Sequence, residues 1–218
     1  MRPARGYSAP RFAFREGDSP DDRDRVGVVV LAAGRGSRFG DEAPKTLARL
    51  GSRPLVAHAV AAATASGLRP VVVVVGCQSA EVAAAAGALV EVVENPEWET
   101  GMATSLRAGL AAVLADQSVA AMTVALADQP RIGAEAYRRL VQAHVEGAEL
   151  AVATYGGKRG HPVLIGRPYF EEAMKLTGDQ GARTLLAKPE VVEVPCDGTG
   201  EATDVDTPAD LAALEERN

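Results

Sequence analysis

A glycine-rich loop with two arginines directly follows an apolar run near the start of the chain. The loop comprises Leu31, Ala32, Ala33, Gly34, Arg35, Gly36, Ser37 and Arg38. Its glycines let the backbone approach a phosphate closely and turn several N–H groups toward it. Arg35, Arg38 and the later Lys45 add the positive charge that a triphosphate requires. The loop therefore predicts a triphosphate site, and a purely structural loop is the alternative.

The spacing of this loop differs from that of two other phosphate-binding motifs. A P-loop places lysine directly after a glycine, whereas Lys45 follows Pro44. A dinucleotide-binding loop needs a third glycine three residues after Gly36, where this sequence has Phe39. That motif also predicts an acidic residue closing the second strand, and the sequence there is Gly76-Cys77-Gln78. These differences argue against a P-loop NTPase and against an NAD-binding protein.

Three aspartates stand next to predicted elements, where they could bind a metal ion. Asp128 comes directly after an apolar run, and Asp204 and Asp206 precede the last predicted helix. Magnesium prefers hard oxygen ligands, commonly one or two carboxylates completed by phosphates and water. Aspartates from two separate strand ends meet that requirement. As alternatives, Asp206 could cap the following helix, Asp128 could form a turn, and Asp204 fits a supporting or turn position.

These residues must be positioned by alternating strands and helices. Strands are expected at 26–32, 71–75, 89–93, 121–126, 150–154, 162–165 and 191–194. Helices are expected at 53–66, 79–86, 104–115, 135–145, 168–174, 182–187 and 208–216. The main strands are apolar throughout, which indicates a mostly parallel sheet covered on both faces, with an antiparallel strand or hairpin inserted within 155–196. Ligands of such sheets bind beyond the carboxyl ends of the strands, so segments such as 95–105 are expected near the site.

Composition excludes several other classes of protein. The chain has 218 residues and a net charge of −6, which argues against non-specific nucleic-acid binding because that needs a basic face. Its longest apolar runs have the length of strands, so no membrane-spanning helix is expected, and the first residues lack the apolar core of a signal peptide. We expect a single domain at 26–218, a disordered arm at 1–25, and a cytoplasmic monomer or homodimer.

Several segments, taken in order, resemble the MobA/MocA-like NTP transferase family, and molybdenum cofactor cytidylyltransferases in particular. They read LAAGRGSRFG followed by PK, GMATSLRAGL, LADQP, GHPV, GDQGAR and DVDTPADL, and they extend from about Val26 to Leu214. Members of this family transfer an NMP from an NTP to a phosphate-bearing acceptor and release pyrophosphate. The resemblance implies a Rossmann-like, three-layer α/β/α fold of the nucleotide-diphospho-sugar transferase type.

The resemblance also implies a role for individual residues. The backbone of 31–38 would wrap the base and the phosphates, and Arg38 and Lys45 would contact phosphates. Lys45 would stabilise the charge that develops at the α-phosphate. Asp128 and Asp206 would bind Mg²⁺, with Mn²⁺ as a substitute. On this basis the predicted catalytic residues are Lys45, Arg38 and Asp128.

The remaining segments suggest further binding residues. Ser105 lies at a predicted helix start, where its hydroxyl and the free N–H groups could bind the base or the ribose. The acceptor is expected to contact Gln129, Pro130, Arg159, Gly160, His161 and Asp179. Lys158 and Arg159 could instead belong to a solvated surface loop, and His161 could be structural, so no general base is assigned.

The spacing of Lys45 bears on the choice of acceptor. In the molybdenum cofactor enzymes this lysine stands two residues closer to the loop, and Phe39 replaces their usual methionine. The longer segment from Gly40 to Lys45, together with His58, is similar to methylerythritol-phosphate cytidylyltransferases. We therefore predict a Mg²⁺-dependent transfer of an NMP, preferably CMP, from CTP or GTP to a small phosphate-bearing acceptor, preferably molybdopterin. The alternatives are a cytidylyltransferase for a sugar or polyol phosphate, and a molybdenum cofactor-binding chaperone without transfer activity that partners a molybdoenzyme.

Overall fold

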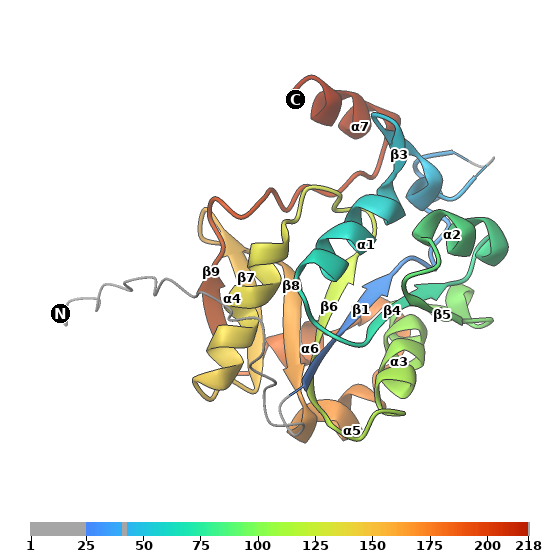
Figure 1. Ribbon diagram of the computed structural model, residues 1–218. Coiled ribbons are helices and arrows are strands. Elements are labelled where there is room, and N and C mark those ends of the chain that lie inside the picture. Colours follow the sequence, from blue (N-terminus) through green and yellow to red (C-terminus); the bar gives the residue numbers. More distant parts are fainter. Residues whose placement is uncertain (1–24, 41–42, 218) are drawn as a thin grey trace.

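A seven-stranded sheet forms the middle layer of the protein (Figure 1). The computed structural model describes residues 25–40 and 43–217. The sheet has the order β5-β4-β1-β6-β8-β7-β9. Its strands are β1 (Arg25–Leu31), β4 (Val71–Val75), β5 (Glu91–Glu94), β6 (Val119–Leu126), β7 (Leu150–Tyr155), β8 (Lys158–Gly166) and β9 (Val192–Pro195). Neighbouring strands are parallel except at β8, which runs antiparallel to both β6 and β7. The predicted mostly parallel sheet with an inserted antiparallel strand is confirmed.

Helices cover both faces of this sheet (Figure 1). They are α1 (Leu55–Ala65), α2 (Ser79–Ala86), α3 (Met102–Val113), α4 (Ala134–Val145), α5 (Phe170–Ala173), α6 (Arg183–Leu186) and α7 (Pro208–Glu215). Val28 and Val30 of β1 pack in the cluster that contains α1, α2 and α4, whereas Val29 packs with α3, α5 and α6. Successive residues of a strand point to opposite faces, so a strand covered on both sides is apolar throughout. The predicted three-layer α/β/α fold is confirmed.

Helix α3 lies unusually close to the sheet. A Cβ atom at Gly109 would come within 2.4 Å of Val29 Cγ1 and 3.1 Å of Val74 Cγ2. Only glycine permits this approach without a shift of the helix. Because α3 starts shortly after β5 ends, the contact fixes the first turn of α3, with Met102 and Ser105, at the carboxyl edge of the sheet.

Two short strands and α7 form a small hydrophobic cluster of their own. The hairpin consists of β2 (Arg49–Leu50) and β3 (Arg53–Pro54), and Leu50 packs with Val205 and Leu214. This cluster joins the segment that follows Lys45 to the segment that carries Asp206. The two segments are more than 150 residues apart in the chain, so their alignment depends on this packing.

The sequence prediction failed at a few element boundaries. The helix expected from residue 53 begins only at Leu55, because Pro54 is extended (ψ 149°) and pairs in the hairpin. The helix expected at 168–174 is a 3₁₀ turn, Arg167–Tyr169, followed by the short α5. The arm predicted at 1–25 lies outside the described residues except for Arg25, which begins β1. None of the described helices is long and apolar enough to cross a bilayer.

Candidate active site

A cavity of about 510 Å³ opens at the carboxyl ends of β1 and β6. In parallel α/β sheets the loops after the strands converge at this edge and bind ligands there. The residues that line the cavity are Leu31, Ala32, Ala33, Gly34, Gly36, Ser37, Arg38, Lys45, Thr46, Trp98, Glu99, Gly101, Met102, Ser105, Leu126, Asp128, Asp179 and Asp206. We call this set the nucleotide side, because it contains nearly every residue predicted to bind the nucleotide.

Lys45 joins two predicted metal ligands in this cavity. Its Nζ lies 2.5 Å from Asp128 Oδ2 and 2.7 Å from Asp206 Oδ1. Arg38 Nη1 lies 3.3 Å from the other carboxylate oxygen of Asp206. The side chains of Lys45 and Asp128 are each only 15% exposed. Residues from the end of β6, from the 3₁₀ turn Lys45–Leu47 and from the segment before α7 thus meet at one point.

Burial and charge act in opposite directions on this ion pair. Burial raises the pKa of the Asp128 carboxyl, and the ammonium group of Lys45 offsets only part of that effect. Burial lowers the pKa of Lys45, but the carboxylates of Asp128 and Asp206 outweigh it and raise the pKa overall. A buried carboxylate is costly without a cation nearby. The site therefore requires positive charge next to Asp128.

The donor set is suitable for a divalent metal ion. Asp128 Oδ1 is buried and has no hydrogen-bond partner among the described residues, so one carboxylate oxygen is available as a ligand. Lys45 Nζ shows that Asp128 and Asp206 can both contact a single cation. Within residues 25–40 and 43–217, no group of three or more His, Cys, Asp or Glu side chains could hold a metal ion. Two carboxylates completed by phosphates and water is the pattern that magnesium uses.

The cap of α7 leaves the Asp206 carboxylate available. Thr207 is the N-cap residue, and its side chain accepts a hydrogen bond from the backbone N of Asp210 at 3.2 Å. The Asp210 carboxylate accepts from the backbone N of Thr207 at 2.7 Å, which completes a capping box. The alternative that Asp206 caps this helix is therefore wrong. Asp206 instead accepts from Lys45 and Arg38 through its side chain.

The glycine-rich loop positions Lys45 through its backbone. Gly36 has a φ of +70°, and a Cβ there would come within 2.5 Å of Lys45 Cγ, so only glycine lets the lysine stem cross the loop. The backbone N of Lys45 donates to the carbonyl of Arg35 at 3.2 Å. The side chain of Arg35, by contrast, lines a neighbouring cavity of about 300 Å³, together with Gln78 and Trp98. Arg35 is the one predicted nucleotide-binding residue that is absent from the lining of the larger cavity.

Several lining residues carried no distinctive signal in the sequence. Trp98 contributes to the walls of both cavities, and it packs on the loop because Gly76 has no side chain. A Cβ at Gly76 would lie 2.7 Å from Trp98 Cβ and 2.8 Å from the carbonyl oxygen of Ala33. Position after a strand pointed to the segment 95–105, and the motif GMATSLRAGL begins with Gly101 and Met102, but nothing in the residue types identified Trp98 or Glu99. Thr46 was missed for the same reason.

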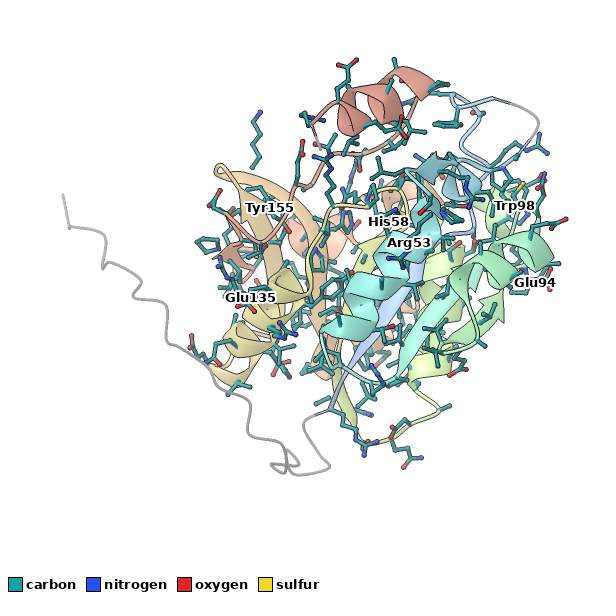
Figure 2. All side chains as sticks on the ribbon, turned by 45° about the horizontal axis from the view of Figure 1, so that its top comes forward. Arg53, His58, Glu94, Trp98, Glu135 and Tyr155 are labelled. Atoms are coloured by element: carbon teal, nitrogen blue, oxygen red, sulfur yellow. The ribbon has the colours of Figure 1, made fainter. Side chains whose placement is uncertain are left out.

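Most predicted acceptor residues lie outside the larger cavity. Asp179 is the exception, because it lines the cavity beside Gly101. The other five are absent from the lining residues described, and we call them the acceptor side: Gln129, Pro130, Arg159, Gly160 and His161. Figure 2 places Trp98, on the nucleotide side, and Tyr155, next to the acceptor side, far apart across the molecule.

Most polar side-chain groups of Gln129 and Arg159 are bound to neighbours, but the buried Oε1 of Gln129 has no hydrogen-bond partner among the described residues. Gln129 is 4% exposed and donates to Asp204 Oδ1 at 2.7 Å. Arg159 lies 2.8 Å from Glu193 Oε1 and donates to the carbonyl of Leu186 at 2.7 Å. Lys158 and Arg159 belong to strand β8, so the loop expected there is incorrect.

His161 is held in a neutral state at physiological pH. Burial lowers the pKa of its imidazole to about 4, although the charge of Asp204 opposes this shift. Its carbonyl accepts a hydrogen bond from the hydroxyl of Tyr155 at 3.0 Å. A neutral, buried imidazole fits the structural alternative for His161.

Comparison with known proteins places the chain among nucleotidyltransferases. Residues 28–194 match the model of the MobA-like NTP transferase domain family. Bifunctional protein GlmU from Cereibacter sphaeroides is 33% identical over 145 residues, which are 66% of this chain and 31% of that protein. The chain thus spans about a third of the length of the curated relatives it matches.

Solved structures extend the likeness over most of the chain. Rv0371c from Mycobacterium tuberculosis has a TM-score of 0.76 and 30% identity, covering 89% of this chain and 99% of that one. The same protein in complex with manganese has a TM-score of 0.72, at 30% identity over 89% of this chain and 100% of that one. A nucleotidyl transferase from Methanothermobacter thermautotroptrophicus shares the fold, with a TM-score of 0.73 at 23% identity over 88% and 97% of the two chains.

Proposed function

The chain belongs to the MobA-like NTP transferase family, and on this premise we propose which transfer it performs. The NMP donor is an NTP, preferably CTP, and the acceptor is a small phosphate-bearing molecule, preferably molybdopterin. The reaction requires Mg²⁺, which Mn²⁺ can replace, and it releases pyrophosphate. The observation that carries this proposal is the position of Lys45 between the carboxylates of Asp128 and Asp206, in the same cavity that the glycine-rich loop lines.

The chemistry is an in-line displacement at the α-phosphorus. An oxygen of the acceptor phosphate forms the new bond to phosphorus, the bond to the β-phosphate breaks, and pyrophosphate leaves. A phosphate nucleophile is already ionised near pH 7, so no general base is needed and catalysis depends on positioning and charge neutralisation. This agrees with a neutral His161 on the acceptor side.

Each residue of the cluster has a separate task in this reaction. Lys45 and Arg38 neutralise negative charge on the phosphates, and the backbone of 31–38 orients the triphosphate. Asp128 and Asp206 would hold the metal ion, with Asp128 Oδ1 free to act as a ligand. The ion, when bound, would polarise phosphate oxygens and screen their charge. The manganese complex of Rv0371c supports a divalent metal in this fold.

Sequence supports two acceptors, and the site residues do not decide between them. The segments GMATSLRAGL and DVDTPADL favour molybdopterin. The longer segment from Gly40 to Lys45 favours a sugar or polyol phosphate. In either case Asp179 is the predicted acceptor residue that lines the cavity, whereas Gln129 and Arg159 lie outside its lining.

Pyrophosphate release tests the proposal directly. Each of CTP, GTP, UTP and ATP is incubated with Mg²⁺ and either molybdopterin or a set of sugar and polyol phosphates. We expect release with CTP and molybdopterin, and none without an acceptor. Release only with a sugar or polyol phosphate would identify the alternative acceptor. Binding of molybdopterin without release from any NTP would instead support a carrier of the cofactor and overturn the proposed transfer.

A further inference from the structure

Asn95 is a buried amide between the end of β5 and the start of α3. It is 4% exposed, and both polar groups of its side chain have partners. Its backbone N donates to the carbonyl of Val75 at 2.8 Å, and its Oδ1 accepts from the backbone N of Glu97 at 3.0 Å. Its Nδ2 donates to Thr104 Oγ1 at 2.8 Å and to Ser105 Oγ at 3.0 Å. The cavity lining contains Ser105 but not Asn95.

The backbone fixes which way this amide points. The N–H of Glu97 is a donor, so it must face the oxygen of the Asn95 side chain and not its NH₂ group. The flipped amide would set donor against donor at Glu97 and leave its oxygen facing two hydroxyls. The NH₂ group of Asn95 is therefore directed at Thr104 and Ser105.

Counting hydrogens then determines the role of each hydroxyl. An amide NH₂ has two hydrogens, and Asn95 uses one on each hydroxyl oxygen, so both oxygens act as acceptors toward it. Thr104 directs its own hydrogen to the carbonyls of Gly101 at 2.9 Å and Glu97 at 3.1 Å. The hydrogen of Ser105 finds no acceptor among the residues described. Since Ser105 lines the cavity, this hydrogen is available to a ligand there.

The wall around Ser105 offers donors to a ligand. The first turn of a helix has N–H groups without intrahelical partners, and α3 begins at Met102 in this same wall. The cluster of Lys45, Asp128 and Asp206 takes the phosphates, so a nucleotide held there extends its base along the remaining lining. We propose that Asn95 is a positioning residue that makes the Ser105 hydroxyl a donor to an acceptor atom of the nucleobase. This inference rests on the proposed function, because it requires an NTP in the cavity.

The direction of this hydrogen bond restricts what the base can present. A carbonyl oxygen or an unprotonated ring nitrogen satisfies a hydroxyl donor, whereas an exocyclic amino group does not. Asn95 occupies one of the two lone pairs of the Ser105 oxygen and leaves its hydrogen facing the cavity; without Asn95 both lone pairs would be open and the hydroxyl could rotate to accept from such an amino group. Asn95 thus contributes to base selection although it touches no part of the ligand.

The test compares Asn95→Asp with Ser105→Ala by calorimetric binding of two probes. One probe is the NTP that the wild type binds most tightly among the four, and the other is inorganic tripolyphosphate, both with Mg²⁺. Aspartate keeps the shape of asparagine but replaces the NH₂ donor by an acceptor, which turns the Ser105 hydrogen away from the cavity. Each variant should bind the NTP about tenfold more weakly, which is the loss of one hydrogen bond. Binding of tripolyphosphate, which has no base, should not change.

A variant that carries both substitutions shows whether Asn95 acts through Ser105 or affects NTP binding independently of it. If Asn95 acts through Ser105, Asn95→Asp combined with Ser105→Ala binds the NTP no more weakly than Ser105→Ala alone. Fold losses that multiply, or an unchanged NTP affinity in Ser105→Ala, would overturn the inference. The Ser105→Ala result stands even where Asn95→Asp unfolds. A wild type that binds tripolyphosphate but none of the four NTPs would instead overturn the proposed function.

Discussion

The nucleotide side and the acceptor side share one edge of the sheet but hold their polar groups in opposite ways. On the nucleotide side, charged groups from three distant segments converge on one point around Lys45. On the acceptor side, Gln129 and Arg159 are bound to neighbours outside the cavity. The charged groups of the first arrangement pair with one another in the wall of the cavity, where a metal-bound anionic ligand can exchange them directly. Arg159 must leave partners outside the cavity before it can contact a ligand there, so NTP binding is expected to depend little on the acceptor side.

Removal of the Asp128 carboxylate should have the largest effect and tests the nucleotide side at its centre. Asp128→Ala takes away the metal ligand with the free oxygen and leaves Lys45 paired only with Asp206. We expect kcat to fall by at least about 10³-fold, because neutralisation of charge at the phosphates is lost. The fold should survive, since loss of a buried carboxylate removes a desolvation cost. Pyrophosphate release and thermal unfolding measure the two quantities.

Asp204→Asn is the matched control for that experiment. It removes the aspartate two residues before Asp206, but Asp204 is absent from the described cavity lining and accepts a hydrogen bond from Gln129. Its kcat should stay within about tenfold of the wild type. Equal losses of kcat in both variants would show that the total negative charge near the site matters and not the position of Asp128. The contrast between the nucleotide side and the acceptor side would then be wrong.

Lys45→Met should distinguish the effect of the Lys45 charge from the effect of its side-chain packing. Methionine retains an apolar stem over Gly36 but removes the ammonium group between Asp128 and Asp206. We expect kcat to fall about 10²-fold. Mn²⁺ without nucleotide should bind about tenfold more tightly, because the two carboxylates lose the cation that now neutralises them. Electron paramagnetic resonance of free Mn²⁺ measures this affinity.

Arg38→Met is the control, because within the described part of the chain the exposed guanidinium pairs with Asp206 alone, at 3.3 Å. It should lower kcat less and leave the affinity for free Mn²⁺ within about twofold. An unchanged Mn²⁺ affinity in Lys45→Met would show that the lysine and the metal ion do not share their carboxylates.

His161 makes the acceptor side sensitive to pH in its stability. Its pKa is lowered to about 4 in the folded protein, from 6.5 in the unfolded chain. Between these values only the unfolded chain takes up a proton, so stability is complete above pH 6.5 and falls as the pH approaches 4. Between pH 7 and 4.5 the wild type should lose about 2 to 3 kcal/mol more than His161→Gln. Urea unfolding at the two pH values measures this difference, and equal losses would place the imidazole in contact with water.

The two sides also differ in how far the sequence predicts them. Asp128 and Asp206 could be found because each carries a charge near the end of a predicted strand or the start of a helix, and Lys45 because it follows the glycine-rich loop. The side chain of Arg35 could not be placed, because the smaller cavity that it lines with Gln78 and Trp98 is assembled from segments far apart in the chain. The role of Asn95 could not be predicted, because it depends on hydrogen bonds to Thr104 and Ser105, and these residues belong to a separate element, α3.

On the acceptor side the sequence prediction failed because it could not foresee which segments pair with one another in the folded protein. The run from Lys158 to His161 looked like a free cationic loop, but pairing with β7 makes it a strand. The ion pair of Arg159 involves Glu193 on the opposite neighbour of β7, a contact between residues 34 apart in the chain. No local pattern indicates such a partner. The position of these charged residues near a strand end therefore identified them as candidates. It did not show whether their side chains are free to bind an acceptor.

The smallest expected effect tests whether Arg159 can be released toward the acceptor. Glu193→Gln removes the charge that holds the Arg159 guanidinium, at 2.8 Å on a largely exposed surface. Exposed ion pairs contribute less than about 1 kcal/mol, so the KM for the acceptor should fall only about two- to threefold, with the KM for the NTP unchanged. In an Arg159→Met background the same change at Glu193 should have no effect, since there is no guanidinium to release. If neither substitution alters the KM for the acceptor, Arg159 serves only to link β8 to β9 across β7, and the acceptor phosphate must be bound from the nucleotide side.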